Sequence, residues 1–423
     1  MLTAPIATRV SSIDGFRVAK ISIVTTSHIS SNPRVWREAD ALSVAGHDVV
    51  VIGVWFDPVE AELDQQMLKS RSWHFIPAAD LRGPSFYSKA HRLWSRLTAK
   101  CGRILLEHSI RNANALGYAV SSLYRCAFRQ RAQLTITHLE PALWVGLELK
   151  RMGFAVGVDF EDWYSEGSTE TPLNTPSLRF YRDLERKILN YAVHVTATTR
   201  SMANALQEAY SPRNITVIYN STPVIAEGPS SPSDDTLRLL WFSQTLGKDR
   251  GLQDIFAALP LLRGQWNLEL RAKASPSMRA WVDSQVGPEV RSRIQIEPTV
   301  PPEELSNVVV RHDVGLALEQ PCCLNRQLTA TNKIFQYLQS GLLVAATDTP
   351  GQQEVLSQVP LAGVCYAPGD FQALAEILNG WIRGLPGIRQ RKNWIYREAN
   401  RRFSYQHQSE SLLDSVDRAL KAS

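Results

Sequence analysis

Three loop-to-helix junctions in the second half of the sequence could present backbone N–H groups to an anion, and two of them also carry basic side chains. The first carries Lys248 and Arg250, the second ends in Lys333, and the third spans 348–354, where a glycine follows a proline. Backbone N–H groups at helix N-termini attract anions, and lysine or arginine side chains add full positive charges. These junctions therefore predict a site for a diphosphate group whose charge the basic side chains neutralise.

Polar side chains in the first half of the sequence follow apolar segments that are typical of strands. His138 lies near the end of QLTITHL with Glu140 just beyond it, and DFEDW brings Asp159, Glu161 and Asp162 to the end of another such segment. Open parallel sheets bind ligands beyond the carboxyl ends of their strands. His138 is therefore the first catalytic candidate, and Glu161 is a candidate base for a hydroxyl group. A hydrogen-bonded core histidine and a solvated acidic turn are the structural alternatives.

The cysteines do not suggest metal or disulfide chemistry. There are five of them, without regular spacing and without a Cys-x-x-Cys pair, which favours a reducing compartment. We therefore expect no metal site and no cofactor. Segment 1–17 has no apolar block of signal-peptide length, and no later segment is long and apolar enough to span a bilayer. The expected location is the cytoplasm.

The elements that must position these residues alternate between strands and helices. Strand 18–27, helix 35–46 and strand 47–54 form a first parallel unit, and a second alternating series begins at residue 237. The sequence therefore predicts an α/β protein of two doubly wound Rossmann-like domains that face a cleft. The expected boundaries are 1–223 for the N-terminal domain, 224–236 for a linker rich in Ser, Pro and acid, 237–402 for the C-terminal domain and 403–423 for a C-terminal helix.

Six segments keep an order and a spacing that are informative together. They are NPRVWREADALSVAGHDVVVIG, ITHLEP, ITVIYNSTP, LLWFSQTLGKDRGLQDIFAAL, DVGLAL and TNKIFQYLQSGLLVAATDTPGQQEV. In this order they resemble a retaining glycosyltransferase with the GT-B fold, of the glycosyltransferase family 4 kind. The resemblance runs from Val18 to about Leu420. It implies that the C-terminal domain holds a nucleotide-sugar donor and that the N-terminal domain holds the acceptor.

The resemblance also implies roles for residues of the C-terminal domain. Arg250 falls at the family's basic phosphate-binding position, and Gln244 stands where a second arginine is common. Gln336 and Leu328 stand where the family has two glutamates. Gln336 can accept a hydrogen bond from a ribose hydroxyl, but without charge assistance. Leu328 cannot bind the sugar, so Glu319 or Gln320 is expected to reach that place from the loop. The expected donor-binding residues are Gln244, Lys248, Arg250, Glu319, Asn332, Lys333 and Gln336.

In the N-terminal domain the resemblance places His138 at the histidine that contacts the donor sugar. Arg34 and Glu140 are the expected acceptor-binding residues, and a solvated charge at a helix end is the alternative for Arg34. The stretch 80–131 is basic and aromatic, with only two acids, and predicts one or two amphipathic helices. We expect it to make a peripheral contact with an anionic membrane, on the inner face. Such a stretch could also bind nucleic acid. The sequence has no nucleic-acid-binding motif, however, so nucleic acid is not an expected partner.

The predicted reaction is the transfer of a hexose from a UDP- or GDP-sugar to a glycan or lipid-linked acceptor, in polysaccharide biosynthesis. Two alternatives remain open. One is a GT-B sugar-nucleotide epimerase, which would need acid and base carboxylates facing the donor sugar. The other is a non-catalytic nucleotide-sugar-binding protein, which the uncharged Leu328, Gln336 and Gln244 would suit.

Overall fold

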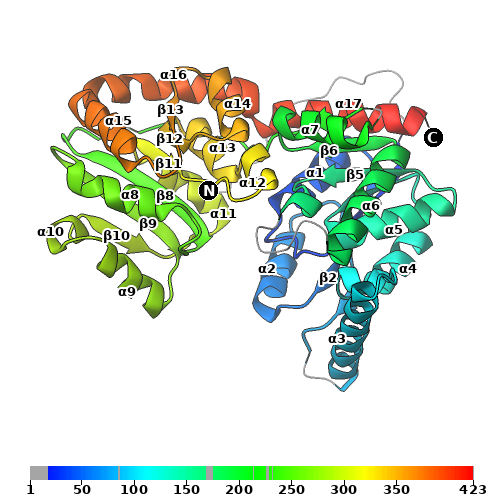
Figure 1. The fold of residues 1–423 in the computed structure, drawn as a ribbon. Helices are drawn as coiled ribbons and strands as arrows, with labels where there is room; N and C mark the ends of the chain where they lie inside the picture. Colours follow the sequence, from blue (N-terminus) through cyan, green and yellow to red (C-terminus); the bar gives the residue numbers. More distant parts are fainter. Residues whose placement is uncertain are drawn as a thin grey trace. The chain divides into compact units, whose positions relative to one another are not determined.

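The computed structural model describes residues 18–83, 86–167, 175–212, 214–224, 228–230 and 232–422 (Figure 1). By their contacts the residues divide into two compact units. The first holds Met1–Asp159, Asp183–Val195 and Leu412–Ser423, and the second holds Phe160–Arg182 and Thr196–Ser411. The segment 1–17 and parts of the expected linker 224–236 lie outside the described residues. The domain boundaries given above therefore stay a prediction.

The first sheet has seven strands in the order β3-β2-β1-β4-β5-β6-β7, and its described pairs are parallel. The strands are β1 (Lys20–Val24), β2 (Asp48–Trp55), β3 (His74–Asp80), β4 (Leu134–His138), β5 (Val156–Phe160), β6 (His194–Ala197) and β7 (Thr216–Val217). Every residue of β4, β5 and β6 is buried, as expected for parallel strands that helices cover on both faces. The strand order reverses between β1 and β4, which marks the place where such sheets bind ligands.

The second sheet has six strands in the order β10-β9-β8-β11-β12-β13, again with parallel pairs. The strands are β8 (Leu237–Thr245), β9 (Trp266–Lys273), β10 (Ile294–Glu297), β11 (Val314–Ala317), β12 (Leu343–Thr347) and β13 (Gly363–Tyr366). Its strand order reverses between β8 and β11. A continuous apolar core of the second unit packs around this sheet, with Trp241 and Tyr337 among its largest fully buried side chains.

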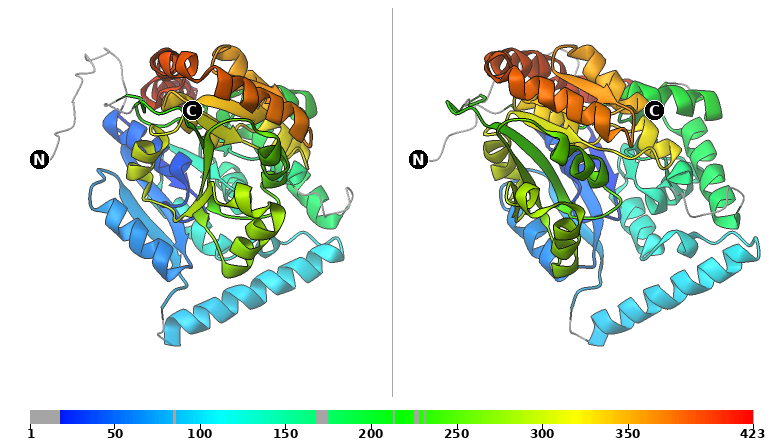
Figure 2. Two further views of the ribbon diagram at one scale, coloured as in Figure 1. Left: turned by 90° about the vertical axis from the view of Figure 1, so that its left-hand side faces the viewer. Right: turned by 60° about the vertical axis from the view of Figure 1, so that its left-hand side comes forward.

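Helices join most of the strands, as Figures 1 and 2 show. In the first part of the chain they are α1 (Pro33–Val44), α2 (Pro58–Leu68), α3 (Phe86–Glu107), η1 (Ala113–Leu116), α4 (Val120–Gln130), α5 (Glu140–Arg151), η2 (Tyr164–Glu166), α6 (Pro176–Tyr191) and α7 (Arg200–Tyr210). In the rest they are α8 (Leu252–Ala258), η3 (Leu259–Leu261), α9 (Pro276–Gln285), α10 (Pro288–Arg291), α11 (Pro302–Val309), α12 (Leu324–Leu328), α13 (Asn332–Gln339), α14 (Pro350–Gln358), α15 (Phe371–Arg383), α16 (Leu385–Phe403) and α17 (Tyr405–Lys421).

The predicted fold class is confirmed, because both sheets are parallel and alternate with helices. The helix expected at 35–46 is α1, and Gly46 follows it with a φ of 95°, in the left-handed region that favours glycine. Helix α8 ends at Ala258, where the chain passes into the 3-10 turn η3 just before Pro260. β3 was not predicted, because it is a sheet edge of mixed burial that contains Pro77.

The stretch 80–131 forms α3, η1 and α4, which agrees with the expected amphipathic helices. Within the part of the chain that the structure describes, no helix combines the length and the apolar character that crossing a bilayer requires.

Candidate functional site

The loop between β8 and α8 lies at the reversal point of the second sheet. Gly251 precedes α8 with a φ of 72°, and a Cβ atom there would come within 2.1 Å of the carbonyl oxygen of Leu318. A side chain at this position would therefore displace either this loop or the end of β11. The close approach brings Arg250 and Lys248 to the carboxyl ends of the two central strands, where Rossmann-like sheets bind nucleotides.

The two basic side chains of this loop have few counter-charges. Lys248 is exposed, and Nε of Arg250 lies 3.9 Å from Oδ1 of the exposed Asp249. The Nε atom of Arg250 is buried without a hydrogen-bond partner among the described residues. A phosphate oxygen would satisfy both the charge and this donor. Gln244 is exposed near the end of β8.

A buried ion pair lies beyond β11. The carboxylate of Glu319 accepts from the hydroxyl of Thr331 at 3.1 Å, lies 2.5 Å from Nζ of Lys333, and lies 3.7 Å from Nη1 of Arg326. Burial raises the pKa of Glu319, but the charge and hydrogen bond of Lys333, the charge of Arg326 and the hydrogen bond of Thr331 together outweigh it and hold this pKa below its usual value. Glu319 is thus a charged acceptor, and the charge of Lys333 is already compensated in this structure.

The remaining predicted donor-binding residues lie on α13. Asn332 is exposed in its first turn, whereas Gln336 is 5% exposed and donates from Nε2 to Oγ of Ser306 at 2.9 Å. Leu328, which takes the place of a family glutamate, is buried on α12. The amide group of Gln336 is therefore held in one orientation by α11, with its oxygen atom as the remaining acceptor.

In the first unit His138 belongs to a buried polar network at the end of β4. Its Nε2 atom lies 2.7 Å from Oε2 of Glu38, and its Nδ1 atom lies 3.6 Å from Oδ2 of Asp159. Arg34 donates from Nη2 to Oδ1 of Asp159 at 2.9 Å. Oε1 of Glu38 also lies 4.0 Å from Nε2 of His194. Burial lowers the pKa of His194, although the nearby carboxylate of Glu38 opposes this effect.

Glu38 is the residue of this network that the sequence analysis missed. It lies on α1 among buried apolar residues, four positions after Arg34, so both side chains project from the same face of the helix. An acid on the apolar face of an amphipathic helix was the available signal. The side chain of His138 is completely buried, so the network fixes its orientation. Arg34 and His138 are brought together around Asp159.

Glu140 and Glu161 follow the same two strands, β4 and β5, just beyond His138 and Asp159. Glu161 follows β5 and is half-buried, and its neighbour Asp162 accepts from Nδ2 of Asn325 at 2.8 Å. Glu140 begins α5 and lines a pocket with Arg92 and Arg96 of α3. No group of three or more His, Cys, Asp or Glu side chains in the described ranges could hold a metal ion.

Known proteins share a domain and a fold with this chain. Residues 31–221 match the description "Glycosyl transferase 4-like domain", and this range includes Arg34, Glu38, His138 and Asp159. Three similar solved structures are a sucrose-phosphate synthase from Thermosynechococcus elongatus, HepE of Anabaena in complex with UDP, and WaaG, a glycosyltransferase involved in lipopolysaccharide biosynthesis. None of the curated proteins matches the sequence.

The similarity to these structures covers nearly the whole chain at low identity. The TM-scores are 0.68 for the synthase, 0.67 for HepE and 0.59 for WaaG, with sequence identities of 14%, 17% and 12%. The matches cover 96%, 94% and 93% of this chain and 100%, 99% and 98% of the other chains, in the same order. The chain has the GT-B fold. The matched domain and the fold together indicate a glycosyltransferase.

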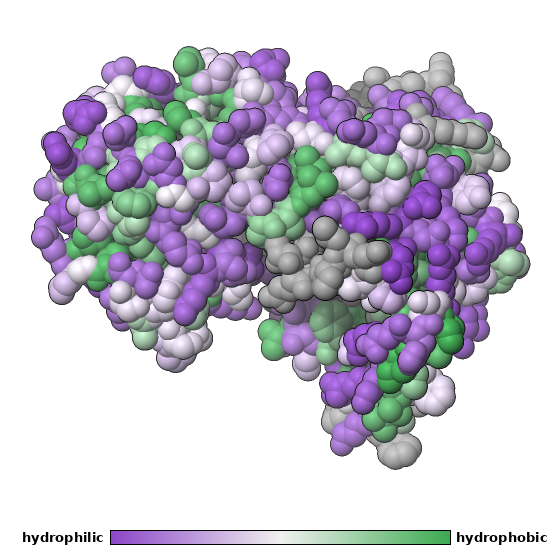
Figure 3. Space-filling view, in the orientation of Figure 1, coloured by the Kyte–Doolittle hydropathy of each residue, from purple (hydrophilic) through white to green (hydrophobic). Residues whose placement is uncertain are grey.

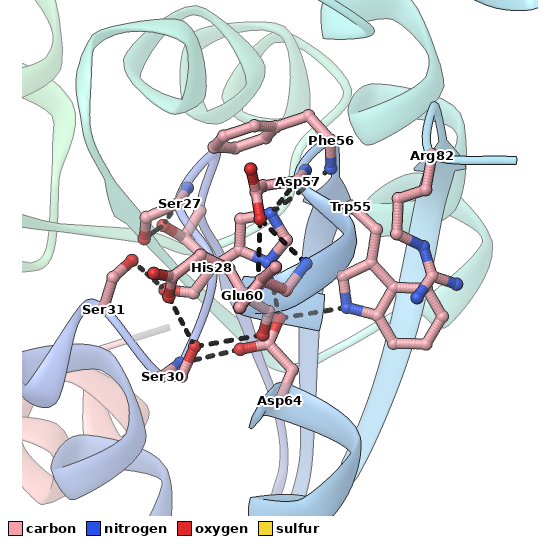
Figure 4. A network of polar contacts seen from close by, with 12 residues as sticks. Ser27, His28, Ser30, Ser31, Trp55, Phe56, Asp57, Glu60, Asp64 and Arg82 are labelled. Carbon is pink, nitrogen blue, oxygen red and sulfur yellow. Dashed lines mark hydrogen bonds and ion pairs between the residues drawn. The ribbon is translucent and has the colours of Figure 1, made fainter. Parts of the chain in front are cut away.

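The first unit contains a second buried polar network, in the loop that follows β1 (Figure 4). The sequence analysis did not predict it. Nδ1 of His28 lies 2.8 Å from Oδ2 of Asp64, and Nε2 of His28 accepts from the backbone N–H groups of Phe56 and Asp57. Because Nε2 accepts, Nδ1 carries the proton and donates it to Asp64. Asp64 also accepts from Ser30 N at 2.8 Å. The network fastens the loop after β1 to the end of β2.

We expect Asp64→Asn to lower the acid sensitivity of this unit as well as its stability. Burial raises the pKa of Asp64, but the hydrogen bonds from His28 and Ser30 outweigh it, and the net pKa is below the usual value. A carboxyl group with a depressed folded-state pKa stabilises the protein above its unfolded pKa, and this stability disappears as the pH falls through the folded value.

The variant should lose about 2 kcal/mol of unfolding free energy at neutral pH, since hydrogen bonds to charged groups are worth about that much. Urea unfolding measured from neutral to acidic pH checks both statements. Asp48→Asn, an exposed aspartate at the start of β2, is the matched control. If the unfolding free energy of Asp64→Asn falls with decreasing pH as steeply as that of the parent, the assigned protonation of the pair is contradicted.

Proposed function

We propose that this glycosyltransferase moves a hexose from a UDP- or GDP-sugar to a glycan or lipid-linked acceptor with retention of the anomeric configuration. The observation that carries the proposal is the reversal point of the second sheet. There Gly251 admits the loop that bears Arg250, and the charged pair of Glu319 and Lys333 lies beyond the neighbouring strand. HepE, a similar structure, is described in complex with UDP and with UDP-glucose, which supports a uridine diphosphate donor.

In the proposed reaction Arg250 and Lys248 hold the diphosphate, with Lys333 beside them. The bond between the sugar C1 atom and the phosphate oxygen breaks, and the electron pair leaves with the nucleoside diphosphate. The basic side chains stabilise the negative charge that develops there, which is the role a divalent metal ion would otherwise fill. Glu319 accepts from a hydroxyl of the sugar, and the amide oxygen of Gln336 accepts from the ribose.

The acceptor hydroxyl forms the new bond to C1 on the face from which the leaving group departs. Its proton passes to an oxygen of the departing phosphate or to Glu161, so that atoms and charge balance. Arg34 and Glu140 bind the acceptor in this scheme. Asp159 and Glu38 act through Arg34 and His138, as positioning residues.

Release of nucleotide tests the proposal directly. The protein is incubated with UDP-glucose, UDP-galactose or GDP-mannose and a cell-envelope extract, with and without EDTA, and free UDP or GDP is measured. Proton NMR of the product gives the anomeric configuration. We expect release with one donor, insensitivity to EDTA and a retained configuration. No release with any donor would contradict transfer, and a changed sugar still linked to nucleotide would indicate an epimerase.

The neutral side chain of Gln336 gives a further prediction. Gln336→Glu should lower the donor KM by about tenfold, since a hydrogen bond to a charged group exceeds a neutral one by about 1–2 kcal/mol. Steady-state kinetics with the preferred donor measure this change. Gln285→Glu, at an exposed position of α9, is the control and should leave KM unchanged. If both variants and the parent protein show no turnover, the chain is a nucleotide-sugar-binding protein.

A further inference from the structure

The outward face of α3 carries a strip of exposed apolar side chains. Leu93 is 59% exposed, Trp94 67%, Leu97 49% and Ile104 45%. Residues 93, 97 and 104 recur at helical spacing, so they lie along one line, with Trp94 beside it. Figures 1 and 2 show α3 as a long helix on the outside of the first unit, and Figure 3 shows hydrophobic residues gathered along it. Exposed apolar strips of this kind mark contact surfaces.

Basic side chains border this strip on one side. Lys89, Arg96, Lys100 and Arg103 are all exposed and follow one another at intervals of three, four or seven residues. No acidic residue occurs between Asp80 and Glu107, and none of the four has an ion-pair partner among the described residues. The charges are therefore available to an anionic surface that also accepts the apolar strip.

The opposite face of α3 is fixed to the first unit. Ser95, Ala99, Gly102 and Leu106 are buried at helical spacing. A Cβ atom on Gly102 would lie 2.6 Å from the backbone nitrogen of Ala115, so η1 packs directly against the helix. Because this inner face is closely packed, α3 cannot turn its apolar strip toward the first unit without breaking these contacts. The strip therefore stays exposed.

A pocket of about 460 Å³ lies behind α3 in the same unit. Apolar side chains form most of its lining, and Arg92 and Arg96 of α3 line it as well. Nη2 of Arg92 donates to the carbonyl oxygen of Gly83 at 3.1 Å, and its Nε atom is buried without a hydrogen-bond partner among the described residues. The apolar part of the lining comes from Val54, Phe56, Leu81, Leu116 and Pro141. Two arginines beside apolar side chains suit the phosphate of an amphiphile.

We propose that α3 docks this protein on an anionic lipid bilayer and that Arg92 and Arg96 hold the phosphate of a membrane-embedded acceptor lipid in the adjoining pocket. Leu93, Trp94, Leu97 and Ile104 insert at the level of the headgroups, and the basic border pairs with lipid phosphates. Arg96 belongs to both surfaces. The bilayer contact stands on the structure of α3 alone, whereas the role of the pocket as an acceptor site rests on the proposed transfer reaction.

Co-sedimentation with vesicles tests the docking without any need for activity. The full chain should bind vesicles of mixed phosphatidylcholine and phosphatidylglycerol, bind pure phosphatidylcholine poorly, and be released by salt. A basic residue near the surface contributes about fivefold to affinity, so Lys100→Gln with Arg103→Gln should weaken binding about 25-fold. Leu93 is 59% exposed and Leu97 49%, so insertion buries about half of each side chain, and Leu93→Gln with Leu97→Gln should weaken binding about tenfold or more.

Matched controls come from elsewhere in the first unit. Lys69→Gln with Arg186→Gln removes two exposed basic residues, and Val44→Gln with Met152→Gln removes two exposed apolar ones. Both controls should bind as the parent does. Absence of binding to either vesicle, equal binding to both, or undiminished binding by the α3 variants would overturn the docking proposal.

The pocket is tested with dihexanoyl phosphatidic acid, a soluble phosphate-bearing lipid, and with inorganic phosphate. Calorimetry should show binding of the lipid, with at least tenfold weaker binding in Arg92→Gln with Arg96→Gln. Equal affinity for inorganic phosphate would overturn the lipid assignment, and unchanged affinity in the variant would overturn the role of the pocket. Nucleotide binding by the same proteins is measured in parallel, so a failed donor site and a failed acceptor pocket are distinguishable.

Discussion

Arg250→Ala should reduce kcat/KM for the nucleotide-sugar by about 100-fold or more, the effect of removing one preorganised donor from a group that gains charge in the transition state. Among the described residues the guanidinium of Arg250 has one ion-pair partner, the exposed carboxylate of Asp249 at 3.9 Å, so its charge is poorly compensated without a ligand. It reaches the end of the sheet because Gly251 permits a backbone approach that no other residue would allow. Steady-state kinetics and calorimetric titration with UDP measure the loss.

The control for this experiment is Arg279→Ala. Arg279 is exposed on α9, and its loss should leave kcat/KM and UDP affinity unchanged. Arg250→Lys keeps the charge but not the planar pair of donors, and we expect it to restore part of the lost affinity. Normal UDP affinity in Arg250→Ala would contradict the placement of the diphosphate at this loop, and with it the donor site proposed for the second unit.

Glu38→Ala should lower the unfolding free energy by about 2–4 kcal/mol, because it leaves buried hydrogen-bonding groups without a partner and removes buried side-chain volume. The side chain of Glu38 is 5% exposed and serves two histidines, at 2.7 Å from His138 and 4.0 Å from His194. Its removal leaves buried ring nitrogens without their carboxylate and opens a cavity beside β4. Urea unfolding, followed by the fluorescence and by the far-ultraviolet circular dichroism of the protein, measures the change.

Glu62→Ala is the control for this experiment, and Glu38→Gln separates the effect of packing from the effect of side-chain orientation. Glu62→Ala removes an exposed glutamate from α2 and should change the unfolding free energy by less than about 0.5 kcal/mol. Glu38→Gln keeps the shape and one acceptor atom, so it should lose less stability than the alanine variant. If His138 must be held in one orientation for transfer, Glu38→Gln should lower kcat with little change in donor KM. A stability of Glu38→Ala equal to that of the parent would refute the importance of the network.

The buried network around His138 contains two of the residues that the sequence suggested for the site, His138 and Arg34. His138 has no exposed side-chain surface and lies between two carboxylates, so its ring is oriented by Glu38 and Asp159. Arg34 is held by Asp159 as well. The two residues that the sequence marked as separate candidates thus act as one unit, and the assignment of the proton acceptor to Glu161 or to the donor phosphate stays a prediction.

The alternation of apolar strands and amphipathic helices was readable in the sequence, because burial on both faces of a parallel sheet requires continuous runs such as VGVDF in β5. The junction at Arg250 and Gly251 was readable as well, since the helix start and its basic residues are neighbours in the chain. The basic and apolar character of α3 also follows from local periodicity, although not the direction in which its apolar strip points.

Only the tertiary structure decided which distant polar groups meet. Glu38 and His138 are 100 residues apart, and His28 and Asp64 are 36 apart. Likewise, the pairing of Lys333 with Glu319 and of Gln336 with Ser306 depends on how helices pack beside β11. Periodicity reports which residues are buried, but not which partner satisfies a buried charge, because many acids and bases compete for that place until the backbone is folded.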